Sequence, residues 1–304
     1  MDLTLVTEGL QFPEGPVAMA DGSVVLVEIK RQTLTRVTPD GTQHVIAHLG
    51  GGPNGAAVGP DGKVYVCNNG GFLWVDRDDG FTAPHGYPAD YVSGSIQRVD
   101  LATGAVATLY TACDGRPLRG PNDIVFDKDG GFWFTDLGKS DGEKMDMGAV
   151  LYAKTDGSFI KRARDGMVSP NGIGLSPDQK TAWVAETHTG RLWGFDIAGP
   201  GEFAAPADMW SAGRVLGPLP GYQLFDSLAV EAGGKVCVAT LVTGGVTAFD
   251  PAGGSEHFPL ADPLTTNICF GGADMRDAWI TASGTGKLYR TRWPRPGLKL
   301  NFNA

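Results

Sequence analysis

Short apolar runs recur along the chain, separated by turn-forming residues. They come in pairs, and the second run of each pair is rich in β-branched and aromatic residues, as in VVLV, VYVC, FWFT, AWVA, VCVA and AWIT. Such residues favour strands, while Asp-Gly steps favour tight hairpins because glycine accepts a positive φ. Helical periodicity is absent, so the pattern predicts a chain of short antiparallel strands.

Six copies of one unit follow one another along the chain. Each unit opens on a polar residue that we call its anchor: Glu14, Asn54, Asn122, Asn171, Asp226 and Asn267. Seven positions after the anchor, five of the six units carry aspartate, and at the eighth position four carry glycine. The anchors are 40 to 68 residues apart, which fits four-stranded propeller blades with inserted loops.

We therefore predict an all-β fold, a six-bladed β-propeller with four antiparallel strands per blade, and treat residues 1–304 as one such domain. The N-terminal segment DLTLVTE is expected to pair beside KLYRTRW, which closes the ring and removes exposed sheet edges. A seven-bladed propeller or a large β-sandwich is the alternative, and six anchors disfavour both.

In a propeller, the anchors would surround one mouth of the central channel. Every anchor offers a side-chain oxygen and two are carboxylates, which favours a site for a hard cation. The alternative use of such residues is local hydrogen bonding to the backbone. Polar residues that end the return strands should form an outer ring, unless they are ordinary exposed strand ends: Glu28, Asn68, Asp136, Glu186, Thr240 and Thr281. His188 follows Glu186 closely and is either part of this face or a surface histidine.

Composition narrows the class of protein. A hydrophobic share of 42% and a mean hydropathy of -0.10 fit a globular chain, and 45 glycines fit many tight turns. The net charge of -9, without a basic cluster, disfavours nucleic acid, and no apolar run is long enough to predict a membrane span. Four scattered cysteines in largely apolar runs and no signal-peptide pattern lead us to expect reduced thiols and a cytoplasmic protein.

Several segments together resemble the SMP-30/gluconolactonase/LRE family. They are FPEGP, GPNDIVFDKDG, SPNGIGLSPD, FDSLAVEAGGKVCVA and TTNICFGG, in the family's order across residues 8–293, and the insertion beginning NNGGFLWVDRDDG is similar to bacterial sugar-lactonase-like members. The resemblance implies a propeller that binds one divalent cation and hydrolyses lactones. By motif, the metal ligands would be Glu14, Asn171 and Asp226. Asn122 would contact the substrate, and Ser227 stands where members often have glycine.

The resulting prediction is a metal-dependent lactonase that opens a small sugar lactone to its hydroxy acid. The metal would polarise the carbonyl and Asp226 would serve as general base. Arg119, three residues before Asn122 where some members have a substrate-binding arginine two before it, joins Glu186 and His188 as a substrate-binding candidate. Oxygen ligands make calcium the first choice of ion, with magnesium, manganese, zinc or iron as alternatives. The partner would be a small lactone, and the protein a monomer or small homo-oligomer.

Three alternatives stay open. The same metal site could serve a phosphotriesterase or a hydrolase of non-sugar lactones and esters, since one fold supports several chemistries. The protein could instead be a non-catalytic propeller that binds a ligand and holds a structural ion. Finally, the aromatic-rich insert of residues 72–93 is either a lid or rim of the site, or ordinary packing beneath a long loop.

Overall fold

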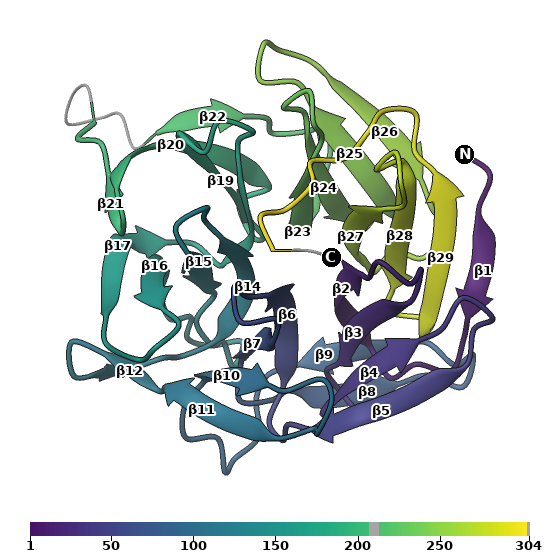
Figure 1. Ribbon diagram of the computed structural model, residues 1–304, viewed down its shortest axis with the longest axis horizontal. Helices are drawn as coiled ribbons and strands as arrows, with labels where there is room; N and C mark the ends of the chain where they lie inside the picture. Colours follow the sequence, from purple (N-terminus) through teal and green to yellow (C-terminus); the bar gives the residue numbers. More distant parts are fainter. Residues whose placement is uncertain (207–212, 303–304) are drawn as a thin grey trace.

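Six antiparallel sheets surround a central channel in a computed structural model of the chain, which describes residues 1–206 and 213–302 (Figure 1). The described residues form strands, turns and loops without a helix, so they also contain no helix long and apolar enough to cross a membrane. The predicted six-bladed β-propeller is confirmed.

Each blade begins with its innermost strand and continues outwards. The first blade is β2 (Pro13–Ala18), β3 (Val24–Glu28), β4 (Thr33–Val37) and β5 (Gln43–His48). The second is β6 (Pro53–Val58), β7 (Val64–Asn68), β10 (Ser95–Val99) and β11 (Val106–Tyr110). The third is β14 (Pro121–Phe126), β15 (Gly131–Asp136), β16 (Gly148–Lys154) and β17 (Ile160–Met167).

The other three blades repeat this order. The fourth is β18 (Pro170–Leu175), β19 (Thr181–Glu186) and β20 (Arg191–Gly199), with β21 (Glu202–Phe203) and β22 (Arg214–Leu216) both paired to β20. The fifth is β23 (Leu224–Val230), β24 (Val236–Leu241), β25 (Gly245–Phe249) and β26 (Ser255–Pro259). The sixth is β27 (Thr265–Gly271), β28 (Asp277–Ala282), β29 (Lys287–Arg292) and β1 (Thr4–Thr7). Two hairpins lie outside the blades: β8 (Leu73–Asp76) with β9 (Thr82–His85), and β12 (Ala112–Cys113) with β13 (Arg116–Pro117).

The ring closes by pairing the two ends of the chain. Strand β1 is antiparallel to β29, with Thr4 opposite Arg290 and Leu5 opposite Tyr289. The N-terminal strand thus becomes the outer strand of the sixth blade, as the sequence predicted. Closure of this kind leaves no blade dependent on another chain to complete its sheet.

The hairpin turn of every unit has the backbone conformation that its Asp-Gly pattern implies. The residue eight positions after each anchor has a positive φ, and it is glycine in four units: Gly22, Gly62, Gly130 and Gly234. In the other two units Gln179 and Met275 adopt a φ of 57° at the same position. The turn geometry is therefore common to all six units even where the glycine is not.

The hydrophobic core lies between the blades. The described residues form six apolar clusters, and each contains residues of two neighbouring blades. In one of them Val27 of the first blade packs with Val66 of the second. All four cysteines are free, three of them buried and Cys269 half-buried, as expected from their apolar surroundings. Each blade is consequently held by burial against both neighbours.

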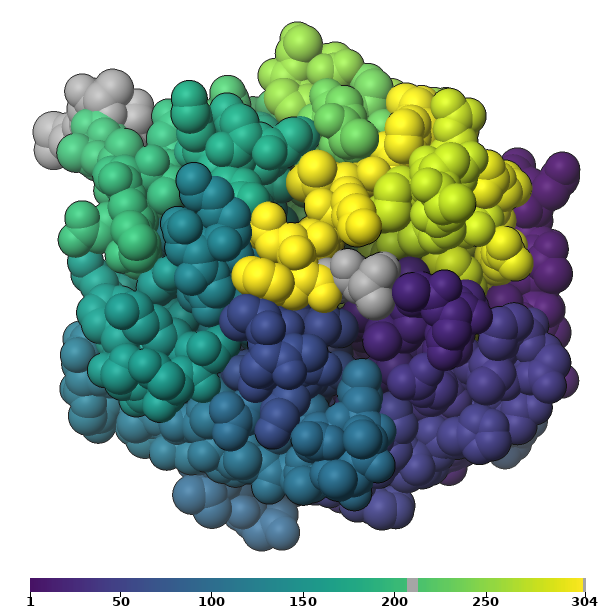
Figure 2. Space-filling model, viewed as in Figure 1, coloured from purple at the N-terminus to yellow at the C-terminus, as the bar shows by residue number. Residues whose placement is uncertain are grey.

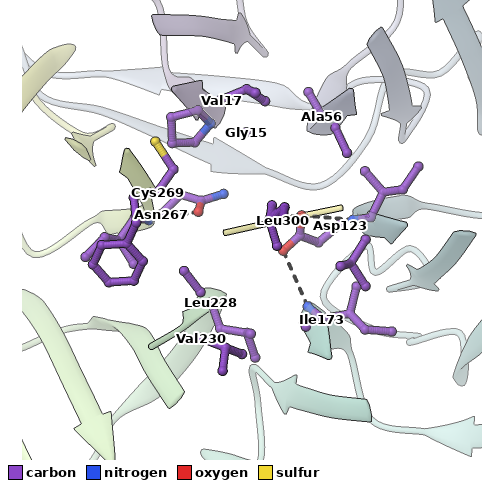
Figure 3. A pocket seen from close by; sticks show the side chains of 18 of the residues that line it. Gly15, Val17, Ala56, Asp123, Ile173, Leu228, Val230, Asn267, Cys269 and Leu300 are labelled. Atoms are coloured by element: carbon purple, nitrogen blue, oxygen red, sulfur yellow. Dashed lines mark hydrogen bonds between the residues drawn. The ribbon is translucent and has the colours of Figure 1, made fainter. Parts of the chain in front are cut away.

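The C-terminal segment, residues 293–302, crosses the channel at the end away from the anchors. The amide of Leu298 donates to Val230 O at 2.8 Å, and Asn301 Nδ2 donates to Phe126 O at 2.9 Å. Figures 1 and 2 show this segment, in yellow, lying across the centre of the ring. A cavity of ≈ 70 Å³ lies inside, lined by Asp123 and Asn267 as well as by Leu298 and Leu300 (Figure 3). The segment thus covers one end of the channel.

A long connection between β7 and β10, residues 69–94, runs along the face of the ring where the anchors lie; we call it the strap. The ring centroids of its Trp74 and of Phe12 are 5.0 Å apart, and Asp76 forms a salt bridge with Lys30 of the first blade. Farther on, Thr82 N donates to Gly284 O of the sixth blade at 2.8 Å. The strap therefore contacts loops of the first and sixth blades. Figure 1, viewed from the end that the C-terminal segment covers, shows β8 and β9 behind β4 and β5.

Candidate active site

The six anchors are brought to one mouth of the channel. Each is the second or third residue of an innermost strand, and these strands neighbour one another around the ring. The residue after the anchor is glycine in three blades, and Gly15, Gly55 and Gly172 each face the backbone of the next innermost strand with no room for a Cβ. The strands therefore approach closely, and the anchor side chains share a confined space.

Glu14 is held at the seam between the first and sixth blades. Its side chain is 2% exposed, and Oε2 accepts hydrogen bonds from Gly15 N and from Asn267 Nδ2, both at 2.7 Å. Burial raises the pKa of Glu14 to about 7, although these hydrogen bonds oppose the rise. Oε1 takes part in neither of these two bonds.

Asn171 is oriented by its neighbours so that its amide oxygen is available. Nδ2 donates to Thr187 Oγ1 at 3.1 Å, while Ser227 Oγ approaches Oδ1 at 3.5 Å. Ser227 is fully buried, and its hydroxyl also opposes the rise in the pKa of the Asp123 carboxyl. The serine that replaces the family's frequent glycine thus acts on Asn171 and on Asp123 and does not displace the predicted ligand.

Asp226 is half-buried, whereas Glu14, Asn122 and Asn171 are buried. Burial, followed by the charges of Glu14 and Asp123, raises the pKa of Asp226 well above its ordinary value. A hydrogen bond with the Asn171 side chain opposes this rise. Among the predicted ligands, Asp226 is therefore the one that an incoming substrate or water can reach most readily.

Asn122 has an unsatisfied acceptor. It is 4% exposed, and its Oδ1 is buried without a hydrogen-bond partner among the residues that the structure describes. Leaving a buried carbonyl oxygen unpaired costs about 1–3 kcal/mol, so such an atom calls for an explanation. A cation or a hydroxyl group of a substrate would satisfy it.

Asp123 is a third carboxylate of the site, and the sequence analysis missed it. It is buried, accepts hydrogen bonds from Ile124 N at 2.9 Å and Ile173 N at 3.4 Å, and faces the channel (Figure 3). Burial and then the charge of Glu14 raise its pKa to about 8. One signal was present: Asp123 occupies the position after the anchor, where Gly15, Gly55 and Gly172 stand in other units.

The donor chemistry of the mouth fits a hard divalent cation. Glu14, Asp123 and Asp226 are mutually repelling carboxylates, and no cationic side chain contributes to their pKa values in the described chain. Within residues 1–206 and 213–302, no three His, Cys, Asp or Glu side chains come close enough together to hold a metal by themselves. An ion here would therefore also use amide oxygens, which the buried Asn122 and Asn171 can supply.

The outer ring turns out to be buried and to secure the loops of the mouth. Asp136 accepts from Arg119 N at 2.8 Å and Gly120 N at 2.6 Å. Glu186 accepts from Val168 N at 2.7 Å through Oε1, and from Thr189 and Trp193 at 2.8 Å through Oε2. Contact between Glu186 and a substrate stays a prediction.

His188 and Arg119 lie on loops of the same face. His188 is exposed, with Nδ1 2.7 Å from Ser169 Oγ. Arg119 is half-buried, donates through Nε to Asp146 Oδ2 at 2.9 Å, and packs over the ring of Tyr91. Both side chains are thus at the rim of the mouth, and their contact with a substrate stays a prediction.

Fold and site together define a six-bladed propeller with an acidic, oxygen-rich mouth. The family described as SMP-30/Gluconolactonase/LRE-like region matches residues 12–284. The chain belongs to this family, which confirms the resemblance noted in its motifs.

The relatives of this chain are named for different activities. The chain is 25% identical over 315 residues to a gluconolactonase of Zymomonas mobilis, covering 95% of this chain and 81% of the relative. It is 27% identical over 205 residues to the diisopropyl-fluorophosphatase of Loligo vulgaris, covering 61% of each chain. A solved structure of a gluconolactonase from Xanthomonas campestris matches with a TM-score of 0.75 and 24% identity over 96% of this chain and 89% of that one, which is a likeness of fold.

Proposed function

We propose that the protein is a metal-dependent lactonase that hydrolyses a small, polyhydroxylated lactone to its hydroxy acid. The observation that carries the proposal is the buried, unpaired Asn122 Oδ1 at a mouth that also holds three carboxylates. Membership of the family and the gluconolactonase named among its relatives support the choice of a lactone.

We place one divalent cation, with calcium as the first choice, on Glu14, Asn171 and Asp226. When bound, the ion would supply a Lewis acid that polarises the lactone carbonyl. Glu14 is steadied by Asn267, and Asn171 by Thr187, so both oxygens are oriented before any ligand arrives. Magnesium, manganese, zinc or iron are the alternatives for the ion.

Asp226 is the proposed general base. It is the most exposed of the three proposed ligands, so one of its carboxylate oxygens can accept the proton of the attacking water. Asn122 Oδ1 would accept a hydrogen bond from a hydroxyl group of the lactone. Arg119 and His188 would bind the substrate from the rim of the mouth. Glu186, two residues before His188 in the chain, is kept as a further substrate-binding residue.

Chelation tests the proposal. The protein is dialysed against a chelator, and acid release from a panel of aldonolactones is followed as single metals are restored. We expect turnover to disappear and to return with calcium or another divalent ion. Full activity after complete metal removal would overturn the mechanism, and no turnover with any metal would favour a non-catalytic binding propeller.

Hydrolysis of a phosphotriester is the second candidate, because one relative is named a diisopropyl-fluorophosphatase. Its chemistry could use the same ion and the same base. Fluoride release from a dialkyl fluorophosphate, measured in the same metal-restored samples, allows this activity to be compared with lactone hydrolysis. A kcat/KM higher for the fluorophosphate than for every aldonolactone would make it the preferred assignment.

A further inference from the structure

Lys139, in the loop between β15 and β16, is a buried lysine that the proposed mechanism does not use. Its side chain is 5% exposed, and Nζ donates to Gly71 O at 2.8 Å and to Asn69 Oδ1 at 3.3 Å. Burial lowers the pKa of Lys139 to about 7, in keeping with an amine enclosed by protein. Both acceptors belong to the beginning of the strap.

Two aromatic rings of the strap enclose the same amine. Nζ lies 4.4 Å from the ring centroid of Phe72 and 5.1 Å from that of Tyr91. Positions 69–72 begin the strap, and Tyr91 is near its end. One side chain of the third blade therefore contacts both ends of the strap, through hydrogen bonds at one end and through cation–π contacts at both.

The contacts continue from the strap to Arg119. Tyr91 Oη donates a hydrogen bond to Arg119 O, and the Arg119 guanidinium packs 5.8 Å from the centroid of the same ring. Asp146 Oδ2 accepts from Arg119 Nε at 2.9 Å and from Lys139 N at 3.2 Å. Of the two groups that orient the Arg119 side chain, Tyr91 contacts the side chain of Lys139, and Asp146 contacts its backbone amide.

We propose that Lys139 is a positioning residue for the lactone site: it clamps the two ends of the strap together and thereby fixes the Arg119 side chain for substrate binding. The proposal rests on the substrate-binding role assigned above to Arg119. The rest of the strap has its own contacts, between Trp74 and Phe12 and between Thr82 and Gly284, so loss of the clamp should act locally at Tyr91 and Arg119.

Lys139→Met tests the clamp, because methionine has a similar length and cannot donate to Gly71 or Asn69. We expect KM for the lactone to rise about tenfold with kcat within about twofold of the parent, since the chemistry is untouched and substrate binding is weakened. Lys161→Met, which removes an exposed pair with Glu202 on an outer strand, is the matched control and should leave KM unchanged. An unchanged KM in Lys139→Met would overturn the proposal.

A double-mutant cycle with Arg119→Ala shows whether Lys139 acts through Arg119. We expect Lys139→Met to change KM by less than about twofold when Arg119 is already absent. The same full increase in both backgrounds would overturn the proposal, as would an Arg119→Ala variant with an unchanged KM.

Hydrogen exchange of the strap amides needs no substrate and separates failure of this proposal from failure of the proposed function. Faster exchange at the two ends of the strap, residues 69–72 and the residues around Tyr91, is expected in Lys139→Met and not in Lys161→Met, whether or not a lactone is turned over. Unchanged exchange in the strap would overturn the clamp.

Discussion

The side-chain amide of Asn267 donates a hydrogen bond to Glu14 Oε2 at 2.7 Å, although 253 positions separate the two residues in the chain. The bond joins the innermost strand of the sixth blade to that of the first, where the ring closes. A proposed metal ligand is therefore held in place by the closure of the fold itself.

Replacing Asn267 by alanine should weaken the binding of a divalent ion. Glu14 would keep only the hydrogen bond from Gly15 N at Oε2, and loss of a group that orients a ligand typically costs about 10–100-fold in metal affinity. Isothermal titration calorimetry with calcium measures the change. Asn301→Ala, at the far end of the channel, is the control and should bind the ion normally; equal affinities in the two variants would contradict the role of Asn267.

Asp123→Asn removes one of three repelling charges from the mouth. Because the charge of Glu14 raises the pKa of Asp123, and Asp123 raises that of Asp226, the metal-free variant should melt at a higher temperature than the parent at pH 8. Its affinity for a divalent ion should fall, because the attraction for a cation is reduced. Thermal melts with and without calcium test both effects, and a variant that melts lower without metal and binds calcium normally would contradict them.

The stability of the metal-free protein should fall as the pH rises. Glu14 and Asp123 have native pKa values of about 7 and about 8, above the values near 4 of unfolded carboxyl groups. Between these limits the native state binds more protons than the unfolded state, so the free energy of unfolding decreases with increasing pH. A saturating divalent ion should remove this loss, since it binds the ionised carboxylates. Denaturation at pH 5.5 and pH 8 with chelator or calcium provides the comparison; metal-free stability that does not change with pH would count against the assignment.

Phe302→Ala should loosen the C-terminal segment that covers the far end of the channel. The Phe302 ring is half-buried against Phe126, with centroids 5.8 Å apart. We expect a loss of about 2 kcal/mol in the free energy of unfolding, roughly half the cost for a fully buried phenylalanine. Urea denaturation measures the loss, while kcat and KM should stay unchanged because the site lies at the opposite mouth. No loss of stability would show that the segment is not needed to cover the channel.

Local sequence determined much of the fold. Paired strands and turns at a fixed distance from each anchor are short-range features, so the six blades could be predicted, as could the pairing of β1 with β29. The positive φ values of Gln179 and Met275 were not predicted, because no glycine signals them there. The C-terminal segment could not be predicted, because its position depends on contacts with Phe126 and Val230, which are distant in sequence.

The site was predictable only as far as the anchors. Asp123 was missed because it follows an anchor and is turned into the channel by the tight approach of neighbouring strands, which the sequence does not display. Lys139 stands in the polar stretch LGKSDGEKM and reads as an exposed lysine, and it is buried only because the strap packs over it. Its effect on Arg119 depends on tertiary contacts with Tyr91.

Equilibrium dialysis against calcium, followed by elemental analysis, tests the central claim most directly. The account predicts one ion per chain for the parent and for Asp178→Asn, which alters an exposed hairpin turn at the far end of the propeller. It predicts essentially no bound ion for Asp226→Asn at the same free calcium concentration. One ion per chain in Asp226→Asn, bound as tightly as in the parent, would contradict the proposed metal site.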